Sequence, residues 1–366
     1  MATLISRINI KSYRGINSLE LNNLQKINLL TGDNNSGKTS VLEVISTFGQ
    51  PDILRSWYRV SRAENQIEGV SLYERMNDLF CINGEEKKII YTIETKEECT
   101  KVELIAKDSE CEMTEKKYFN IMGYTLSQEE QTAIEDSVLV LPQTFFGIKV
   151  NEEEKERIRI VEGQRRTPLS LKKPDKNYTK NVVYISPFEH INGMLFLNDI
   201  LDNPDLYEEM LYILREFDPG ILSINYDDGG TGRRSGYYKI LSKENNRALP
   251  LTMYGDGMKK AILLMSAVVK AKDGILLLDE FETAIHTSAM DKVFQWILDT
   301  CLKLNVQVFM TSHSKEAIDK VLHCSKELQK DMALYTLYKD EEGNSVRRLD
   351  AKKAIDVAEN MGLELR

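Results

Sequence analysis

Residues 32–39 form the pattern that most constrains the fold of this chain. They read Gly-Asp-Asn-Asn-Ser-Gly-Lys-Thr and match the phosphate-binding pattern G-x-x-x-x-G-K-[ST] without a mismatch. The apolar run Ile27–Leu30 precedes the pattern, and residues 40–47 continue with helical spacing until Gly49 and Pro51. The sequence therefore predicts a strand, a glycine-rich loop and a helix at the start of an α/β fold.

The residue types in this loop each have a chemical role. Gly32 and Gly37 allow the backbone to curl, so that successive N–H groups face phosphate oxygens. The start of the following helix adds unpaired N–H groups and a positive dipole end. Lys38 is expected to reach the β- and γ-phosphates, and the hydroxyl of Thr39 to bind Mg²⁺. We therefore predict a nucleotide site formed by Gly32, Asp33, Asn34, Asn35, Ser36, Gly37, Lys38, Thr39 and Ser40.

A second polar cluster follows a buried strand much later in the chain. Residues 275–278 are all apolar, and the strand that they predict ends at Asp279 and Glu280. Beside a phosphate-binding loop, Asp279 is expected to hold the water shell of Mg²⁺. Glu280 is placed to polarise an attacking water as a general base. An acidic pair after a strand is also common as a helix N-cap. The pair therefore indicates a magnesium and water site only because the chain also contains the phosphate-binding loop.

Two further motifs flank this acidic strand. Tyr254-Gly255-Asp256-Gly257-Met258 precedes it and opens an apolar helix near Lys259. The apolar strand predicted at residues 306–314 follows it and places His313 at a strand end. Taken alone, His313 reads as a strand-end histidine whose ring is satisfied by the backbone.

The rest of the chain shows a less regular pattern. Its alternating and apolar runs predict a buried strand at 181–187, a helical region at 195–217, a helix at 314–328 and a short helix after residue 350. They also predict strands at 4–10, 87–95, 100–108 and 138–150, and hairpins at 221–243 and 333–350. Strand–helix alternation at both ends favours a mainly parallel α/β sheet, with the irregular middle as a second lobe.

The order of these motifs resembles that of the ABC-type ATPases. The opening INIKSYRGI and the loop GDNNSGKTS are similar to the RecF/SMC/OLD branch, specifically to stand-alone OLD-like (AAA15) ATPases. The resemblance implies one ATPase head over residues 1–366. Its core would come from 1–50 and 250–335, its inserted β-rich and helical lobes from about 52–250, and a terminal hairpin and helix from 333–366.

The resemblance also implies a mechanism that depends on a homodimer or a larger homo-oligomer. One subunit's phosphate loop and the other's Gly255–Gly257 segment would enclose each ATP. His313 would contact the γ-phosphate and the attacking water, and Arg14 resembles a nucleotide-contacting arginine of this branch. His286 falls in a loop that resembles one crossing the dimer interface. YGDGM departs from the common LSGGQ signature, and residues 186–189 hold no glutamine where the family places one.

Charge limits the binding partners. The net charge of −9 argues against a protein that coats nucleic acid non-specifically. The stretch from Lys155 to Lys180 nevertheless has a strong excess of Lys and Arg. It is either a contact for a nucleic-acid backbone or a solvated loop. Because residues 152–180 also hold two prolines and lack an apolar period, we predict a solvated insertion or loop there.

Several classes of protein are excluded by what the sequence lacks. No apolar run approaches the length of a membrane span, and the first residues do not resemble a signal peptide. The 5 cysteines include no CxxC pair, which argues against a zinc site or a disulfide framework. We therefore expect a cytoplasmic protein without membrane contact.

By resemblance, the chain is expected to be a Mg²⁺-dependent ATPase that acts as a nucleotide-dependent sensor or switch in phage defence. The residues after His313 are too few for the nuclease domain of full-length OLD proteins, so a nuclease or toxin effector would be a separate protein. The alternative is a RecF-like repair ATPase that binds DNA directly. A third possibility is a binding module without hydrolysis, which requires Lys38 or Glu280 to be idle.

Overall fold

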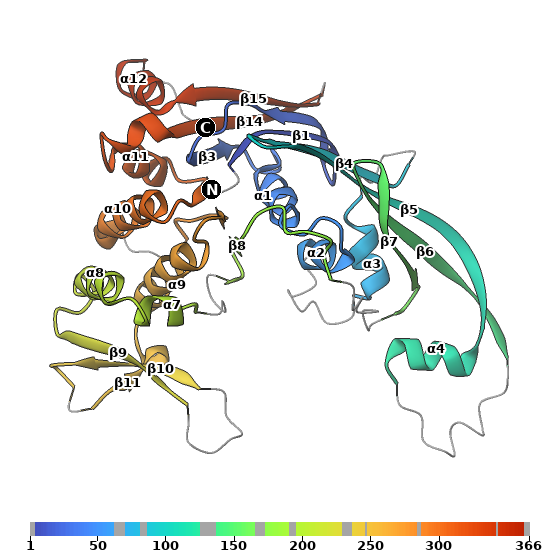
Figure 1. The fold of residues 1–366 in the computed structure, drawn as a ribbon, viewed down its shortest axis with the longest axis horizontal. Helices are drawn as coiled ribbons and strands as arrows, with labels where there is room; N and C mark the ends of the chain where they lie inside the picture. Colours follow the sequence, from blue (N-terminus) through green and yellow to red (C-terminus); the bar gives the residue numbers. More distant parts are fainter. Residues whose placement is uncertain are drawn as a thin grey trace.

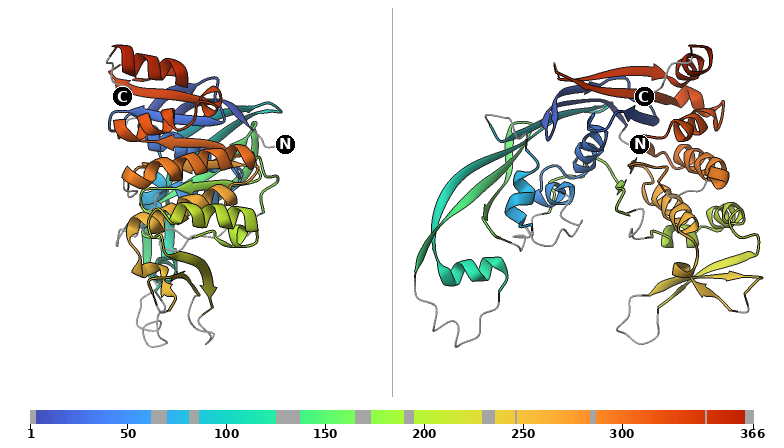
Figure 2. Two further views of the ribbon diagram at one scale, coloured as in Figure 1. Left: turned by 90° about the vertical axis from the view of Figure 1, so that its left-hand side faces the viewer. Right: turned by 180° about the vertical axis from the view of Figure 1, so that it is seen from behind.

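The fold is described from a computed structural model. The residues that it describes are 4–61, 70–80, 86–124, 137–164, 173–189, 195–228, 236–245, 247–283, 287–341 and 343–361. Figure 1 shows two bodies of secondary structure on either side of a central sheet, and Figure 2 shows them from two further directions.

The central sheet has six strands in the order β15-β14-β3-β13-β12-β8. All neighbouring pairs are parallel except the hairpin of β14 and β15, so the predicted mainly parallel sheet is confirmed. In chain order the strands are β3 (Ile27–Gly32), β8 (Val182–Ile185), β12 (Ile275–Leu278), β13 (Gln307–Thr311), β14 (Met332–Asp340) and β15 (Gly343–Asp350).

The central strands are apolar throughout because both faces of the sheet are covered. Every residue of β3, β12 and β13 is buried. Leu276 and Leu278 of β12 join the core beneath one layer of helices, whereas Ile275 and Leu277 join the core on the opposite face. The alternation of side chains along a strand thus connects two hydrophobic cores through one sheet.

Helices cover the two faces unequally (Figure 1). On one face lies α1 (Lys38–Thr47), together with α2 (Leu54–Val60) and α3 (Leu72–Asn77). The other face is covered by the larger layer, which comprises α7 (Asn198–Leu201), α8 (Pro204–Leu214), α9 (Asp256–Lys270), α10 (Thr287–Lys303), α11 (Lys315–His323) and α12 (Ala351–Met361). None of the helices in the described ranges is long and apolar enough to cross a membrane.

A second six-stranded sheet is antiparallel, with the order β2-β1-β4-β5-β6-β7. This sheet curves over α1, α2 and α3. Its long strands β5 and β6 extend past these helices to α4 (Glu115–Met122) (Figures 1 and 2). Its strands are β1 (Ile5–Tyr13), β2 (Ile16–Leu21), β4 (Lys88–Thr95), β5 (Cys99–Thr114), β6 (Val138–Val150) and β7 (Glu153–Val161).

A small third sheet lies below α8 and α9 in the view of Figure 1. It consists of β9 (Ile221–Asp227), β10 (Tyr237–Ser242) and β11 (Leu249–Pro250), followed by the 3₁₀ turn η1 (Leu251–Met253). The predicted hairpin of β9 and β10 is confirmed as an antiparallel pair. A second 3₁₀ turn, η2 (Leu328–Asp331), precedes β14.

The prediction of a solvated insertion or loop over residues 152–180 is wrong for the first part of this stretch. β7 occupies the start of this stretch and pairs with β6 at one edge of the second sheet. Ile160 and Val161 are buried, whereas Glu153 and Glu154 are exposed. An edge strand needs little apolar surface and often carries charges, which is why the charged sequence concealed it. Residues 165–172 lie outside the described part.

The sheets do not follow the predicted lobe boundaries. β8 lies within the predicted insertion at 52–250, yet it pairs with β12 in the central sheet. β1 and β2 lie within the predicted core at 1–50, yet they share a sheet with the inserted strands β4–β7. The first residues of the chain and the insertion therefore form one body around α1.

Candidate nucleotide site

The phosphate loop connects β3 to α1 through left-handed backbone positions. The φ angles of Gly32, Asn35 and Gly37 are 131°, 63° and 103°. A Cβ atom on Gly32 would lie 2.2 Å from the carbonyl oxygen of Leu337 in β14, so no side chain fits there. Gly37 is the N-cap of α1 and has no side chain to bond the helix start, which leaves this end suited to an anion.

Lys38 lies at the centre of the loop and is 5% exposed. Its Nζ donates hydrogen bonds of 2.8 Å to the carbonyl oxygens of Gly32 and of Asp33. Burial lowers the pKa of Lys38, although the nearby carboxylates of Asp279, Asp33 and Glu280 act in the opposite direction. The ammonium group is therefore held inside the loop that the sequence predicts to bind phosphates.

Replacing Gly32 with alanine should disrupt both stability and nucleotide binding. The new Cβ would overlap the backbone of β14 at a φ angle that alanine rarely adopts. We expect a loss of unfolding free energy of about 2 kcal/mol or more, measured by urea denaturation. Gly147→Ala is the matched control, because a Cβ there meets no atom within 4 Å. Equal stability of the two variants would contradict the proposed close approach.

Asp279 connects the start of α1 to the neighbouring strands β13 and β8 through hydrogen bonds. It directly follows β12 and is 1% exposed. Its Oδ1 accepts hydrogen bonds from Thr39 Oγ1 at 3.2 Å and from Thr311 Oγ1, and its Oδ2 accepts one from Tyr184 OH at 3.3 Å. The predicted partners Thr39 and Asp279 are thus in direct contact, although far apart in sequence.

Glu280 has an unusual backbone conformation. Its φ angle is 47°, in the left-handed region that residues other than glycine seldom adopt. Three hydrogen bonds hold it there. Its N–H donates to Thr311 Oγ1 at 2.9 Å, and its carbonyl accepts from Thr283 N at 3.0 Å and from Thr283 Oγ1 at 2.9 Å. Backbone strain that the surroundings maintain is typical of functional sites. Thr311 thus positions both predicted acidic residues.

His313 is joined to the acidic strand by a residue that sequence reasoning missed. Glu282 Oε1 accepts hydrogen bonds from the backbone N–H groups of His313, at 2.9 Å, and Ser314, at 3.3 Å. The loops after β12 and β13 are therefore tied together through a carboxylate. Only its position two residues after Glu280 could have suggested Glu282 from sequence. The role of the His313 ring stays a prediction, and His286 lies outside the described residues.

The Gly255–Gly257 segment is placed away from the phosphate loop of its own chain. Gly255 is the N-cap of α9, and a Cβ there would meet no atom within 4 Å. Asp256 forms an exposed ion pair of 2.8 Å with Lys259. Figure 1 shows α9 beside the third sheet, whereas the phosphate loop lies at the start of α1. α9 begins at Asp256, slightly before the predicted start near Lys259.

Arg14 is anchored to the phosphate-loop helix. Its φ angle is 50°, in the turn between β1 and β2. Its Nε lies 3.1 Å from Oε2 of Glu43 in α1, and its guanidinium donates to the carbonyl of Val60 at 2.8 Å. Tyr13 also donates to Glu43, and burial raises the pKa of Tyr13. Arg14 therefore reaches the helix of the site, and its nucleotide contact stays a prediction.

Much of the described basic stretch is already paired. Lys155 contacts Glu153 and Asp175, Lys176 contacts Glu98, and Lys180 contacts Asp273, all within 3.0 Å. Arg157 packs over the ring of Phe145. Carboxylates of the same chain thus neutralise several of the positive charges that could otherwise contact a nucleic-acid backbone.

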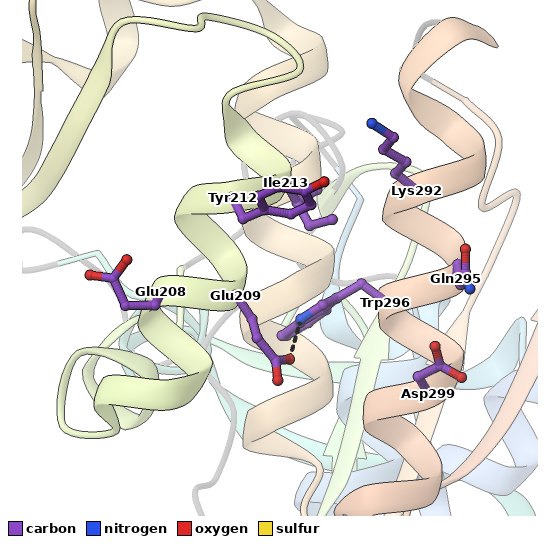
Figure 3. Close-up of a pocket in the computed structure, with 8 residues that line it drawn as sticks. All are labelled: Glu208, Glu209, Tyr212, Ile213, Lys292, Gln295, Trp296 and Asp299. Atoms are coloured by element: carbon purple, nitrogen blue, oxygen red, sulfur yellow. Dashed lines mark hydrogen bonds between the residues drawn. The ribbon is translucent and has the colours of Figure 1, made fainter.

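A groove of about 550 Å³ lies between α8 and α10, outside the predicted site (Figure 3). Tyr212, Ile213 and Trp296 form its apolar part, and Trp296 donates a hydrogen bond to Glu209. It contains none of the motif residues. The predicted nucleotide site, at the phosphate loop and the strand ends, is thus separate from this groove.

Comparisons with known proteins identify a family and several relatives of this chain. A family model described as "AAA domain, putative AbiEii toxin, Type IV TA system" matches residues 27–319. An "ATP/GTP phosphatase" of Helicobacter pylori is 23% identical to this chain, and the alignment covers 93% of this chain and 94% of that protein. The repair protein RecF of Shewanella frigidimarina is 38% identical over 20% of this chain and 21% of its own.

Two solved SMC head structures also align with the chain. The SMC head bound to the C-winged helix domain of ScpA covers 96% of this chain and 99% of its own, with 12% identity and a TM-score of 0.49. The SMC head of Thermotoga maritima covers 94% of this chain and 98% of its own, with 8% identity and a TM-score of 0.40.

The motif order, the joined strand ends and the family match define an ABC-type ATPase. The match extends from β3 to α11 and so includes the phosphate loop, the acidic strand and His313. The chain belongs to the AAA-domain family described as putative AbiEii toxin.

Proposed function

We propose that this chain binds and hydrolyses ATP with Mg²⁺ and acts as a nucleotide-dependent switch subunit of the OLD-like (AAA15) type. The observation that supports this most strongly is the network of Thr39, Asp279, Thr311 and Glu280. It joins the phosphate loop to the two acidic residues through the hydrogen bonds described above. The network brings the residues to which we assign nucleotide binding and water activation next to one another.

The residues present fit a magnesium ion. Mg²⁺ prefers oxygen ligands and is usually held by one or two protein groups together with phosphates and waters. The Thr39 hydroxyl and the Asp279 carboxylate are such ligands, and they lie 3.2 Å apart. Among the described residues, no group of three or more His, Cys, Asp and Glu could hold a metal by itself. When bound, the ion would neutralise charge on the phosphates.

In this proposal each protein group has a separate task. Lys38 and the N–H groups of the loop bind the phosphates. Glu280 accepts a proton from the attacking water, and its carboxylate is oriented by the strained turn in which it lies. His313 senses the γ-phosphate, since Glu282 holds its backbone beside the same turn.

The second half of the site would come from another copy of the chain. The start of α9 faces open space at Gly255 and lies away from its own phosphate loop. The N–H groups at the start of α9 would be suited to the γ-phosphate of a partner's ATP. A homodimer, or a higher homo-oligomer, would complete two equivalent sites.

Chelating Mg²⁺ with EDTA should abolish phosphate release from ATP, and excess Mg²⁺ should restore it. Thr39→Val should raise the Mg²⁺ concentration needed for half-maximal activity by about tenfold, because it removes one of the two protein ligands. Ser46→Ala is the matched control on α1, since the Ser46 hydroxyl donates a hydrogen bond to the helix carbonyl of Glu43. Hydrolysis that continues unchanged in EDTA would refute the magnesium site.

For the biological role, we propose phage defence with a separate nuclease or toxin effector. The description of the family suggests the defence role, and the effector rests on the resemblance to OLD-like ATPases. The alternative is a RecF-like ATPase that contacts DNA through residues 155–180. The local match to RecF favours it, but the ion pairs of Lys155, Lys176 and Lys180 weaken it.

One pair of variants separates these roles. If the chain binds DNA through β7, reversing the exposed charges with Arg157→Glu and Arg159→Glu should abolish a salt-dependent affinity for duplex DNA. Lys116→Glu and Lys117→Glu on α4 provide the control. Absence of salt-dependent DNA binding, together with ATP-dependent co-purification of a protein encoded nearby, would support the defence role.

A further inference from the structure

Lys260 is a buried lysine for which the proposed mechanism has no task. It lies near the start of α9, next to Lys259, but neighbouring helix positions face different directions. Lys259 remains partly exposed and pairs with Asp256. Lys260 points inward and is 0% exposed. An unbranched apolar side chain would fill this position without desolvating a charge, so the presence of lysine requires an explanation.

The ammonium group of Lys260 binds the turn that carries Glu280. Its Nζ donates hydrogen bonds to the carbonyl oxygen of Thr283 and, at 2.9 Å, to Thr283 Oγ1. Thr283 in turn donates from its N–H and its hydroxyl to the carbonyl of Glu280. A chain of hydrogen bonds therefore leads from α9 through Thr283 to the strained backbone of the predicted general base.

Two carboxylates face Lys260 from the same turn. Burial lowers the pKa of Lys260 to about 8, and the charges of Glu282 and Glu280 limit that decrease. Glu282 also accepts the N–H groups of His313 and Ser314, while its other oxygen, Oε2, is buried without a hydrogen-bond partner among the described residues. The positive charge of Lys260 thus stabilises the carboxylate that links the loops after β12 and β13.

We propose that Lys260 is a positioning residue that fixes the Glu280 turn to the helix beginning at the Gly255–Gly257 loop. This inference rests on the proposed hydrolytic function and deepens it. Engagement of the start of α9 by a partner's nucleotide would then be transmitted to Glu280 and Glu282 of the same chain. Lys260 acts through Thr283 and does not touch ATP.

The test is steady-state hydrolysis by the 366-residue chain carrying Lys260→Met. We expect kcat to fall by about tenfold to a hundredfold, since small displacements of a reacting group have effects of this size. KM and the affinity for a fluorescent ATP analogue should stay within about twofold, because the phosphate loop is untouched. Lys270→Met is the matched control, as this lysine lies exposed at the other end of α9. An unchanged kcat in Lys260→Met would overturn the proposal.

A second variant keeps the test decisive if Lys260→Met folds poorly. Thr283→Val replaces an exposed residue and removes the hydroxyl that joins Lys260 to Glu280. It should lower kcat in the same direction, and the double variant should lose less than the product of the two separate effects. Fully multiplicative effects would show that the two residues act independently and would overturn the proposal.

Comparing pH profiles separates positioning from a purely structural role. The pKa of Lys260 is lowered from 10.5 to about 8, so between these values the unfolded chain binds more protons than the folded one. The wild type should therefore gain unfolding free energy relative to Lys260→Met as pH rises through this range. Over the same range the ratio of wild-type to variant kcat should fall, because the neutral amine attracts Glu280 and Glu282 less. If the ratio of wild-type to variant kcat instead rises with pH, together with the unfolding free energy of the wild type, the role of Lys260 is structural and the proposal is contradicted.

Failure of this inference differs from failure of the proposed function. If the chain does not hydrolyse ATP, the wild type itself shows no phosphate release that depends on Lys38. If only the inference fails, the wild type turns over and Lys260→Met matches it.

Discussion

Replacing Glu280 with glutamine is expected to lower kcat for ATP hydrolysis by about 10² to 10⁴-fold while ATP binding is retained. Glutamine has the same shape and preserves the backbone bonds to Thr311 and Thr283, but its amide cannot accept the proton of the attacking water. Bound ATP should then persist, and the chain should accumulate in its assembled state. Phosphate release, nucleotide retention and light scattering measure the three effects.

The control for this variant is Glu316→Gln, which changes an exposed carboxylate at the start of α11. It should leave turnover unchanged. Wild-type turnover in Glu280→Gln would eliminate Glu280 as the general base. The binding-module alternative would be favoured instead if neither the wild type nor the variant releases phosphate.

Replacing Lys38 with alanine should weaken ATP binding by about tenfold to a hundredfold. A hydrogen bond from a charged group contributes about 1.5–3 kcal/mol, and each 1.4 kcal/mol changes Kd tenfold. The variant also removes the bonds to the carbonyls of Gly32 and Asp33, so its thermal unfolding must be recorded in parallel. Titration with a fluorescent ATP analogue measures the affinity.

Lys11→Ala is the control for this experiment, because Lys11 is an exposed residue of β1. Its affinity for ATP should equal that of the wild type. If Lys38→Ala binds ATP as tightly as Lys11→Ala while remaining folded, the phosphate loop is not the nucleotide site.

The buried parallel strands were predictable because burial on both faces of a sheet requires apolar residues along the whole strand, and the sequence shows such a run directly. β3, β12 and β13 are covered on both faces and are therefore apolar throughout. The same reasoning places Asp279 and Glu280 at a strand end. Residues 293–301 of α10 also carry buried apolar side chains at helical spacing, so the sequence contains a local signal for this helix as well.

The residues that escaped prediction depend on contacts between distant segments. Glu282 acquires its role only when the loops after β12 and β13 meet, and Lys260 only when α9 turns it towards Thr283. The charged strand β7 is defined by pairing with β6 more than by its own composition. Local periodicity contains none of this information, because long-range pairing determines which polar side chains become buried.

The position of β3 within its sheet determines the order in which the nucleotide site can mature. β3 lies between β13 and β14, which follow it in sequence by more than half the chain, and Gly32 rests against β14. During synthesis the phosphate loop is therefore made before both strands that flank β3, and it acquires these neighbours only after they have emerged. A ribosome that stops before β14 therefore releases a polypeptide without a finished ATP site. Formation of the phosphate loop thus depends on residues that are synthesised long after it.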